Sequence, residues 1–187
     1  MGTALQSMAV AFLAAAEGTE QVELTRPWER VTAEAGDPVL VSPEPGEIQM
    51  FDHLDRDGRM AVDVPVKTAR EADFAALVLP GGIVGTGKLR ANPDAVAFVR
   101  SFFDTGKPVA AIGHAPLIIL EAGRVRGRAL TSLPSLRRDI ENAGGIWVDE
   151  PAVVCTRAPV LVTSRRPADL PEFCEAMVNV FAVLGRS

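Results

Sequence analysis

The stretch VAAIGHAPLIIL, at residues 109–120, predicts a buried strand that turns sharply into a helix. Its first four residues are all apolar, without the alternation of a half-exposed strand, which is typical of a parallel sheet covered on both faces. Many enzymes carry a nucleophile at the tip of such a strand-to-helix turn. Here the tip is Gly113, which has no side chain, so the stretch indicates either an active site or the remains of one.

Three more apolar runs of the same kind precede this one and predict further core strands. Helical patterns at residues 20–35 and 93–105 alternate with them, and Asn92 before Pro93 is a suitable cap for the second helix. Strand and helix in alternation predict a doubly wound α/β fold, in which helices cover both faces of a mostly parallel, flavodoxin-like sheet. The four predicted strands are MAVAFLAA (8–15), PVLVS (38–42), AALVLP (75–80) and PVAAIG (108–113).

Two regions depart from this alternation. Residues 42–68 carry turn signals at Pro45-Gly46 and Asp57-Gly58, which predict a small antiparallel hairpin on the sheet edge. No linker or internal repeat divides the chain, and we expect a single domain over residues 1–187. The C-terminal third predicts a strand (128–132), a helix (134–144), a hairpin-like pair (146–155 and 158–164) and a closing helix (Pro167–Leu184).

The composition argues against several classes of function. The net charge is −5, no run reaches the roughly 18 apolar residues of a membrane span, and no basic cluster marks a nucleic-acid binder. The apolar run at residues 8–16 has no basic segment before it and predicts a first core strand rather than a signal peptide. Cys155 and Cys174 lie far apart and lack metal-ligand spacing. We therefore expect a cytoplasmic protein without cofactor or metal ion, and with neither nucleic acid nor membrane as partner.

Three segments that follow predicted strands carry the polar and glycine residues of a candidate site. They are residues 17–23, 80–82 and 113–114. Ligands of open parallel sheets bind outside the carboxyl ends of the strands, where these segments would meet. Taken singly, each has a simpler structural explanation: a glycine turn, a histidine at a helix start, and carboxylates that favour a helix N-terminus. Their combination at three strand ends predicts a functional site.

A series of motifs in one order resembles the PfpI-type superfamily. This group includes intracellular protease I, general stress proteins and the parkinsonism-associated deglycase, and it shares the fold of class I glutamine amidotransferases. The resemblance covers nearly the whole chain and implies that fold. It rests on E-x-V-E-L (20–24), A-x-V-x-P-G-G (76–82), K-L-R-A-N-P (88–93), A-I-x-H-x-P (111–116), EAGRVRGRALTS (121–132), LRRDIENAGG (136–145) and TSRRPADLPEF (163–173).

The resemblance implies roles for individual residues, and it also exposes two losses. In that family the turn reads A-I-C-H-G-P and its cysteine is the nucleophile, a position that falls on Gly113 here. An aspartate that is a candidate partner of the histidine falls on Gly87. The remaining roles fall on Glu23 (the carboxyl beside the nucleophile), Gly81 and Gly82 (the oxyanion amides), His114 (the histidine) and Ala115 (the small residue after it).

The loss at Gly113 excludes cysteine chemistry at this turn, because glycine offers no atom that can attack a carbonyl group. Cys155 and Cys174 lie in apolar patterns that are typical of buried, inert thiols. Glycine also relieves the backbone strain of the tip, so the turn can persist without its chemistry. We expect Glu23 to face a gap filled by water, and its pKa to be raised if the pocket is dry.

Three functional hypotheses follow. The first is a pseudoenzyme that binds a small molecule or a partner, or acts in a stress context as the homodimer or larger homo-oligomer that the resemblance implies. The second is an enzyme of the hydrolase, lyase or hydratase type, in which Glu23 and His114 act as acid and base on a small carbonyl-like or nitrile-like substrate. The third is a deliberately silenced protein, which ranks last because it leaves Gly87 unexplained.

Overall fold

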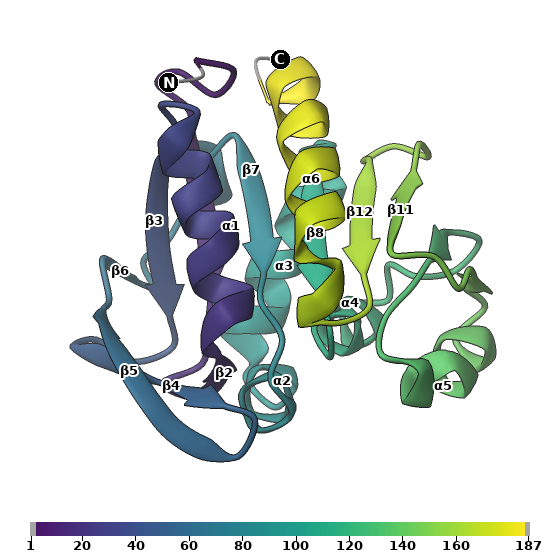
Figure 1. Ribbon diagram of the computed structural model, residues 1–187, viewed down its shortest axis with the longest axis horizontal. Coiled ribbons are helices and arrows are strands. Elements are labelled where there is room, and N and C mark those ends of the chain that lie inside the picture. Colours follow the sequence, from purple (N-terminus) through teal and green to yellow (C-terminus); the bar gives the residue numbers. More distant parts are fainter. Residues whose placement is uncertain (1–2, 186–187) are drawn as a thin grey trace.

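The computed structural model describes residues 3–185 and is built around a seven-stranded sheet in the order β11-β12-β8-β7-β1-β3-β6 (Figure 1). All neighbouring strands are parallel except the edge pair β11 and β12. The four predicted core strands are confirmed. The strands are β1 (Ala9–Leu13), β3 (Asp37–Ser42), β6 (Val64–Pro65), β7 (Ala76–Leu79), β8 (Val109–Ile112), β11 (Ala152–Cys155) and β12 (Leu161–Ser164).

Helices cover both faces of this sheet, which confirms the doubly wound class. Val10 and Phe12 of β1 pack under α1 and α6, whereas Ala11 and Leu13 pack in the cluster on the opposite face with α2 to α5. Both faces are therefore buried, as the continuous apolar runs predicted. The helices are α1 (Gln21–Ala33), α2 (Ile83–Arg90), α3 (Pro93–Thr105), α4 (Pro116–Glu121), α5 (Arg137–Asn142) and α6 (Leu170–Leu184).

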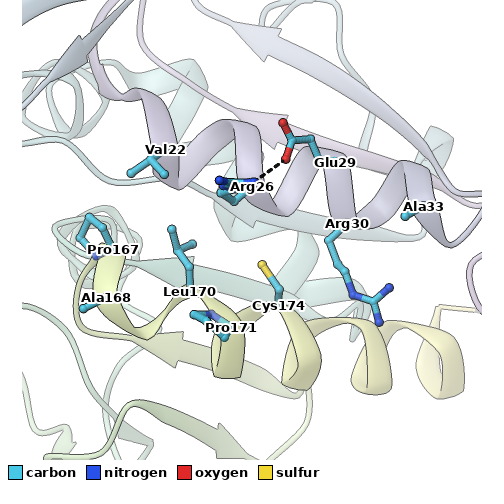
Figure 2. A pocket seen from close by; sticks show the side chains of 10 residues that line it. All are labelled: Val22, Arg26, Glu29, Arg30, Ala33, Pro167, Ala168, Leu170, Pro171 and Cys174. Atoms are coloured by element: carbon cyan, nitrogen blue, oxygen red, sulfur yellow. Dashed lines mark hydrogen bonds and ion pairs between the residues drawn. The ribbon is translucent and has the colours of Figure 1, made fainter.

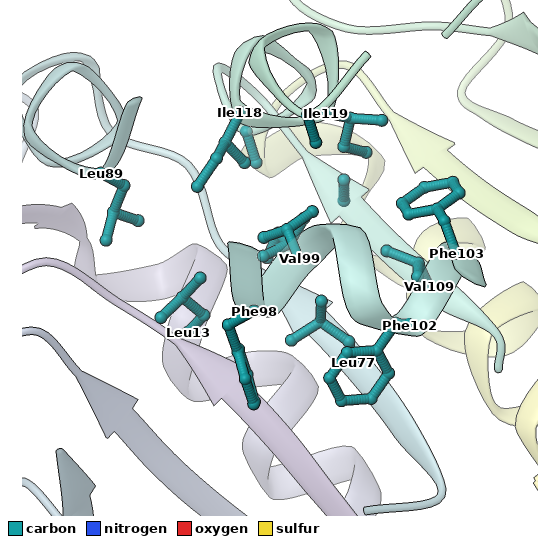
Figure 3. Packing of buried hydrophobic residues seen from close by; sticks show 14 of the residues in the cluster. Leu13, Leu77, Leu89, Phe98, Val99, Phe102, Phe103, Val109, Ile118 and Ile119 are labelled. Atoms are coloured by element: carbon teal, nitrogen blue, oxygen red, sulfur yellow. The ribbon is translucent and has the colours of Figure 1, made fainter. Parts of the chain in front are cut away.

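Helix α3 shows how local sequence and packing agree. The Asn92 side chain accepts a hydrogen bond of 3.0 Å from the Ala95 N–H, which confirms the predicted cap. Phe98 and Phe102 on the buried face of the helix meet edge to face at 5.2 Å, in the cluster that also holds Leu77 and Val109 (Figure 3). This packing holds α3 against one face of the sheet. The candidate site lies at the carboxyl ends of the strands of the same sheet.

The predicted antiparallel hairpin forms, but it does not extend the edge of the main sheet. Strands β4 (Glu47–Asp52) and β5 (Asp55–Ala61) join β2 (Glu17–Glu20) in a separate three-stranded sheet. The predicted turn at Asp57-Gly58 is wrong, because both residues lie inside β5 and the chain turns at His53-Leu54 instead. Glycine at position 58 lets the Gln21 side chain come close to the β5 backbone, since the Gly58 N–H donates to Gln21 Oε1 at 2.7 Å.

The C-terminal third contains the predicted elements with one different pairing. Of the pair predicted over 146–155 and 158–164, only β11 pairs with β12. The earlier part of that first segment, β10 (Ile146–Trp147), runs parallel to β9 (Ala129–Leu130), because α5 lies between them in the chain. Short 3-10 turns, Pro134–Leu136 and Pro167–Asp169, start the two predicted helices. No helix within residues 3–185 is long and apolar enough to cross a membrane.

Candidate functional site

The candidate site is a cavity of about 440 Å³ at the carboxyl ends of the central strands. Its walls include Glu23 at the start of α1, Gly82 after β7, and His114 after β8. The three predicted segments therefore meet, as parallel strands require. The chain has two histidines, and the other one, His53, lines the same cavity.

Gly113 forms the tip of the turn in a left-handed conformation with φ +64°. Its N–H donates to the Ser164 carbonyl at 3.2 Å, and its own carbonyl accepts from the Leu133 N–H at 3.2 Å. A β-carbon added at Gly113 would lie only 2.6 and 2.7 Å from the two carboxyl oxygens of Glu23. The expected water-filled gap is therefore wrong, because the Glu23 carboxyl itself occupies the space of a side chain at this position.

The Glu23 side chain is almost fully enclosed, with 2% of the residue exposed. Its Oε2 accepts a hydrogen bond of 3.0 Å from the Gly81 N–H. Burial, with a further contribution from the charge of Glu20, raises the pKa of Glu23 to about 8, although the Gly81 hydrogen bond opposes the shift. The expectation of a raised pKa agrees with this. Glu23 is thus mainly a neutral carboxylic acid at pH 7, which can both donate and accept hydrogen bonds.

In the turn after β7, the backbone of Gly82 lies against the backbone of residues 18–20 at the edge of the site. Gly82 has φ +107°, and a β-carbon there would clash with the Gly18 carbonyl and lie 2.7 Å from the Glu20 nitrogen. The Gly81 N–H is already used by Glu23. Within residues 3–185, the N–H groups of Gly82 and His114 have no hydrogen-bond partner, so these two can receive an oxygen atom of a ligand.

His114 is half-buried at the cavity wall, and burial lowers the pKa of its imidazole, so the ring is neutral at pH 7. Burial is the cause of this shift, and no carboxylate within residues 3–185 contributes to it. Gly87, where the resemblance places an acid, is exposed on α2 with open space around its Cα. Ala115 is buried at the start of α4 and lies outside the lining of the cavity.

Neither cysteine belongs to this site. Cys174 lines a separate groove of about 680 Å³ between α1 and α6, where its sulfur points toward α1 (Figure 2). Burial raises the pKa of the Cys174 thiol to about 11, which keeps it protonated and weakly nucleophilic. Cys155 is buried in β11. Both fit the predicted role of inert core thiols.

The outer part of the cavity contains residues that sequence reasoning missed. His53 and Leu54 reach it from the β4–β5 turn, and Arg166 reaches it from the segment before α6. The His53 N–H donates to Glu20 Oε2 at 3.1 Å, which ties this turn to the start of α1. The sequence offered one signal for His53: the chain has only two histidines, and each follows a strand. In the structure both line this cavity.

The parallel sheet covered by helices and the sharp strand-to-helix turn at Gly113 define a flavodoxin-like α/β protein. The family model described as the DJ-1/PfpI family matches residues 8–180. The chain belongs to the DJ-1/PfpI family, and the resemblance of its motifs is confirmed.

Known relatives agree with this assignment. Deglycase PH1704 from Pyrococcus horikoshii is 41% identical over 174 residues, which cover 92% of this chain and 99% of the relative. General stress protein 18 from Bacillus subtilis is 41% identical over 114 residues, covering 61% of this chain and 64% of the relative. A two-domain protein with DJ-1/ThiJ/PfpI-like and ferritin-like domains from Anabaena variabilis superposes with a TM-score of 0.83 at 29% identity, covering 91% of this chain and 49% of that structure.

Proposed function

We propose that this DJ-1/PfpI family protein binds a small polar molecule in the pocket at Gly113 without forming a covalent bond to it. One observation carries the proposal: the Glu23 carboxyl fills the space where a side chain of residue 113 would project. No nucleophilic atom is present at the tip, and the two thiols lie elsewhere in the core. We therefore expect no cysteine-dependent turnover of the kind implied by the resemblance.

The chemistry of the walls defines the class of ligand. The inner wall offers the neutral carboxyl of Glu23 and the free N–H groups of Gly82 and His114, which suit a carbonyl or carboxylate oxygen. Arg166 adds a positive charge at the side of the cavity. Apolar side chains line most of the remaining wall, and the volume falls within the range of small-molecule sites. These apolar residues are Leu54, Ile83, Leu133, Pro134 and Pro167.

A second candidate function rests on the two tuned groups in the pocket. Glu23 is mainly protonated at neutral pH, whereas His114 is mainly neutral. One can give a proton and the other can take one, which is the pairing that general acid–base catalysis requires. This supports a hydrolase, lyase or hydratase type of reaction on a small carbonyl-like substrate.

We further propose a homodimer or larger homo-oligomer that acts in a stress context. The support is family membership and the relative named General stress protein 18. Light scattering after size-exclusion chromatography should give a mass of at least twice 19.9 kDa, whereas a mass of 19.9 kDa would contradict the oligomer.

Turnover measurements with and without iodoacetamide test these functions. The binding proposal predicts no methylglyoxal consumption and no peptidase activity, while NMR titration with pyruvate should shift the Gly82 and His114 amide signals. Activity that survives iodoacetamide and disappears in His114→Ala would favour the acid–base candidate instead. A rate that iodoacetamide abolishes would contradict both. The variant Gly113→Cys is the matched control, since it returns a thiol to the same turn.

A further inference from the structure

We propose that Glu20, Asp52 and His53 form a binding site for a divalent transition-metal ion at the rim of the pocket. Glu20 lies at the start of α1, Asp52 ends β4, and His53 follows it in the β4–β5 turn. Glu20 and His53 also line the cavity that holds Glu23 and His114. A metal role in anchoring the pocket's ligand rests on the proposed function, whereas metal binding itself does not.

The separations of the donor atoms match a metal site. His53 Nδ1 lies 3.5 Å from Glu20 Oε1 and 3.7 Å from Asp52 Oδ1, and all three donor atoms lie within 4.8 Å of one another. Ligand atoms of tetrahedral zinc, at bond lengths of about 2.0–2.2 Å, are roughly 3.3–3.6 Å apart. Small side-chain rotations therefore suffice to place the three atoms around one ion.

The fold holds the ligands in place before any ion arrives. Strands β2 and β4 run parallel with Glu20 opposite Phe51, so the next two residues of the chain fall beside Glu20. The His53 N–H donates to Glu20 Oε2 at 3.1 Å, which leaves Oε1 on the side of the imidazole. His53 adopts φ +57°, an uncommon conformation for a residue with a β-carbon, and this turns its ring toward both carboxylates.

Burial and charge complete the site. The Glu20 side chain is only 10% exposed, whereas those of Asp52 and His53 are 74% and 81% exposed, so an ion can enter from solvent. Two carboxylates and one imidazole suit zinc, manganese and iron(II) among the divalent ions. Three protein ligands leave a coordination position open, as in catalytic zinc sites. An ion there would attract and polarise the carbonyl or carboxylate oxygen of a small ligand.

Titration of the tag-free full chain with metal alone tests the proposal. After dialysis against EDTA and then buffer, calorimetry with ZnCl₂ should show one ion per chain, and CoCl₂ should give visible absorption bands of a bound ion. His53→Ala, Asp52→Asn and Glu20→Gln should each weaken zinc binding at least about tenfold. Asp55→Asn is the matched control, because Asp55 is an exposed acid opposite Asp52 that supplies no ligand, and it should bind zinc as the wild type does.

Several outcomes would overturn the proposal. Absence of stoichiometric zinc binding would leave the cluster as a structural contact between His53 and its two carboxylate neighbours, and would refute the metal site. Zinc binding that persists in His53→Ala but disappears in His114→Ala would place the ion elsewhere. Thermal melts of each variant establish that it is folded. The zinc titration contains no organic ligand, so it tests the metal site separately from the pocket function. If zinc does not bind but pyruvate does, the metal site alone is refuted. If zinc binds but pyruvate does not, the proposed pocket function alone is refuted.

Discussion

The inner wall and the outer rim of the pocket differ in how deeply their residues are buried and in whether a side chain has room. The wall consists of Gly81 and Gly113, which pack against the Glu23 carboxyl, and of Gly82, which packs against the backbone of residues 18–20. All three glycines are buried. The rim consists of Glu20, Asp52 and His53, two of which are largely exposed. Both regions contain a left-handed residue, but glycine takes that conformation in the wall and histidine takes it at the rim.

Because of this difference, we expect the wall to affect mainly the stability of the fold and the rim to affect mainly binding. In the wall, a side chain at residue 113 has no room, because the Glu23 carboxyl occupies that space. At the rim, a side chain is kept in spite of a conformation that costs about 1–2 kcal/mol for residues other than glycine. Changes in the wall should therefore alter folding, whereas changes at the rim should alter binding and leave folding nearly intact.

The largest expected effect is the pH dependence that Glu23 adds to stability. Its pKa rises from 4.5 to about 8 on folding, so the folded state keeps the proton longer and stability falls as pH rises between these values. The slope is about 1.4 kcal/mol per pH unit at most, or up to about 4 kcal/mol from pH 5 to 8. Glu23→Gln should flatten this part of the curve in urea melts, whereas Glu29→Gln, on the exposed side of the same helix, should not. Parallel curves for wild type and Glu23→Gln would contradict the burial of the carboxyl.

Substitution of Gly82 should be the most damaging single change in the wall. Gly82→Ala introduces a β-carbon at φ +107° against fixed backbone atoms of the neighbouring loop, and should cost about 3 kcal/mol or more. Gly87→Ala is the control, since α2 has open space there and a helix favours alanine by up to about 1 kcal/mol. Equal effects in denaturant melts would mean that the wall is not close-packed.

Gly113→Ala should cost about 2 kcal/mol, because it combines left-handed strain with displacement of the Glu23 carboxyl. Gly123→Ala isolates the strain, since Gly123 has φ +72° with nothing nearby, and should cost about 1 kcal/mol. In a Glu23→Asp background the shorter carboxyl should remove the excess at Gly113, which a double-mutant cycle measures. An excess that persists there would show that Glu23 is not the obstacle.

The smallest effects on folding should come from the rim. Asp52→Asn and His53→Ala change exposed side chains and should shift the free energy of unfolding by less than about 0.5 kcal/mol. Differential scanning calorimetry checks this, and the zinc titration above checks the accompanying loss of binding. A destabilisation comparable with that of Gly113→Ala would erase the distinction between rim and wall.

Sequence reasoning was most successful where local pattern decides structure. Unbroken apolar runs predicted β1, β3, β7 and β8, because strands buried on both faces need apolar residues at every position. The pairing of β2 with β4 escaped prediction, since register between distant segments leaves little local signal and Asp57-Gly58 mimicked a turn. His53 was missed for the same reason, because its position beside Glu20 exists only after that pairing.

The site shows the same division. The motif resemblance placed Glu23, Gly82 and His114 at one pocket, and the structure brings them together. What could not be read from the residues was the path of a flexible side chain: Glu23 fills the space at Gly113 instead of leaving it to water. The position of the Glu23 side chain depends on the backbone of the turns at Gly81 and Gly113 and on the hydrogen bond from the Gly81 N–H. These groups come together only in the folded structure.

A carboxyl-carbon NMR titration of Glu23 in the native protein is the most direct test of the claim that this side chain is enclosed where a side chain of residue 113 would project. A midpoint for its pKa near 8 is the predicted result. A midpoint at the ordinary value of 4.5 would show a solvated carboxyl and an open turn, and would contradict the account of this pocket.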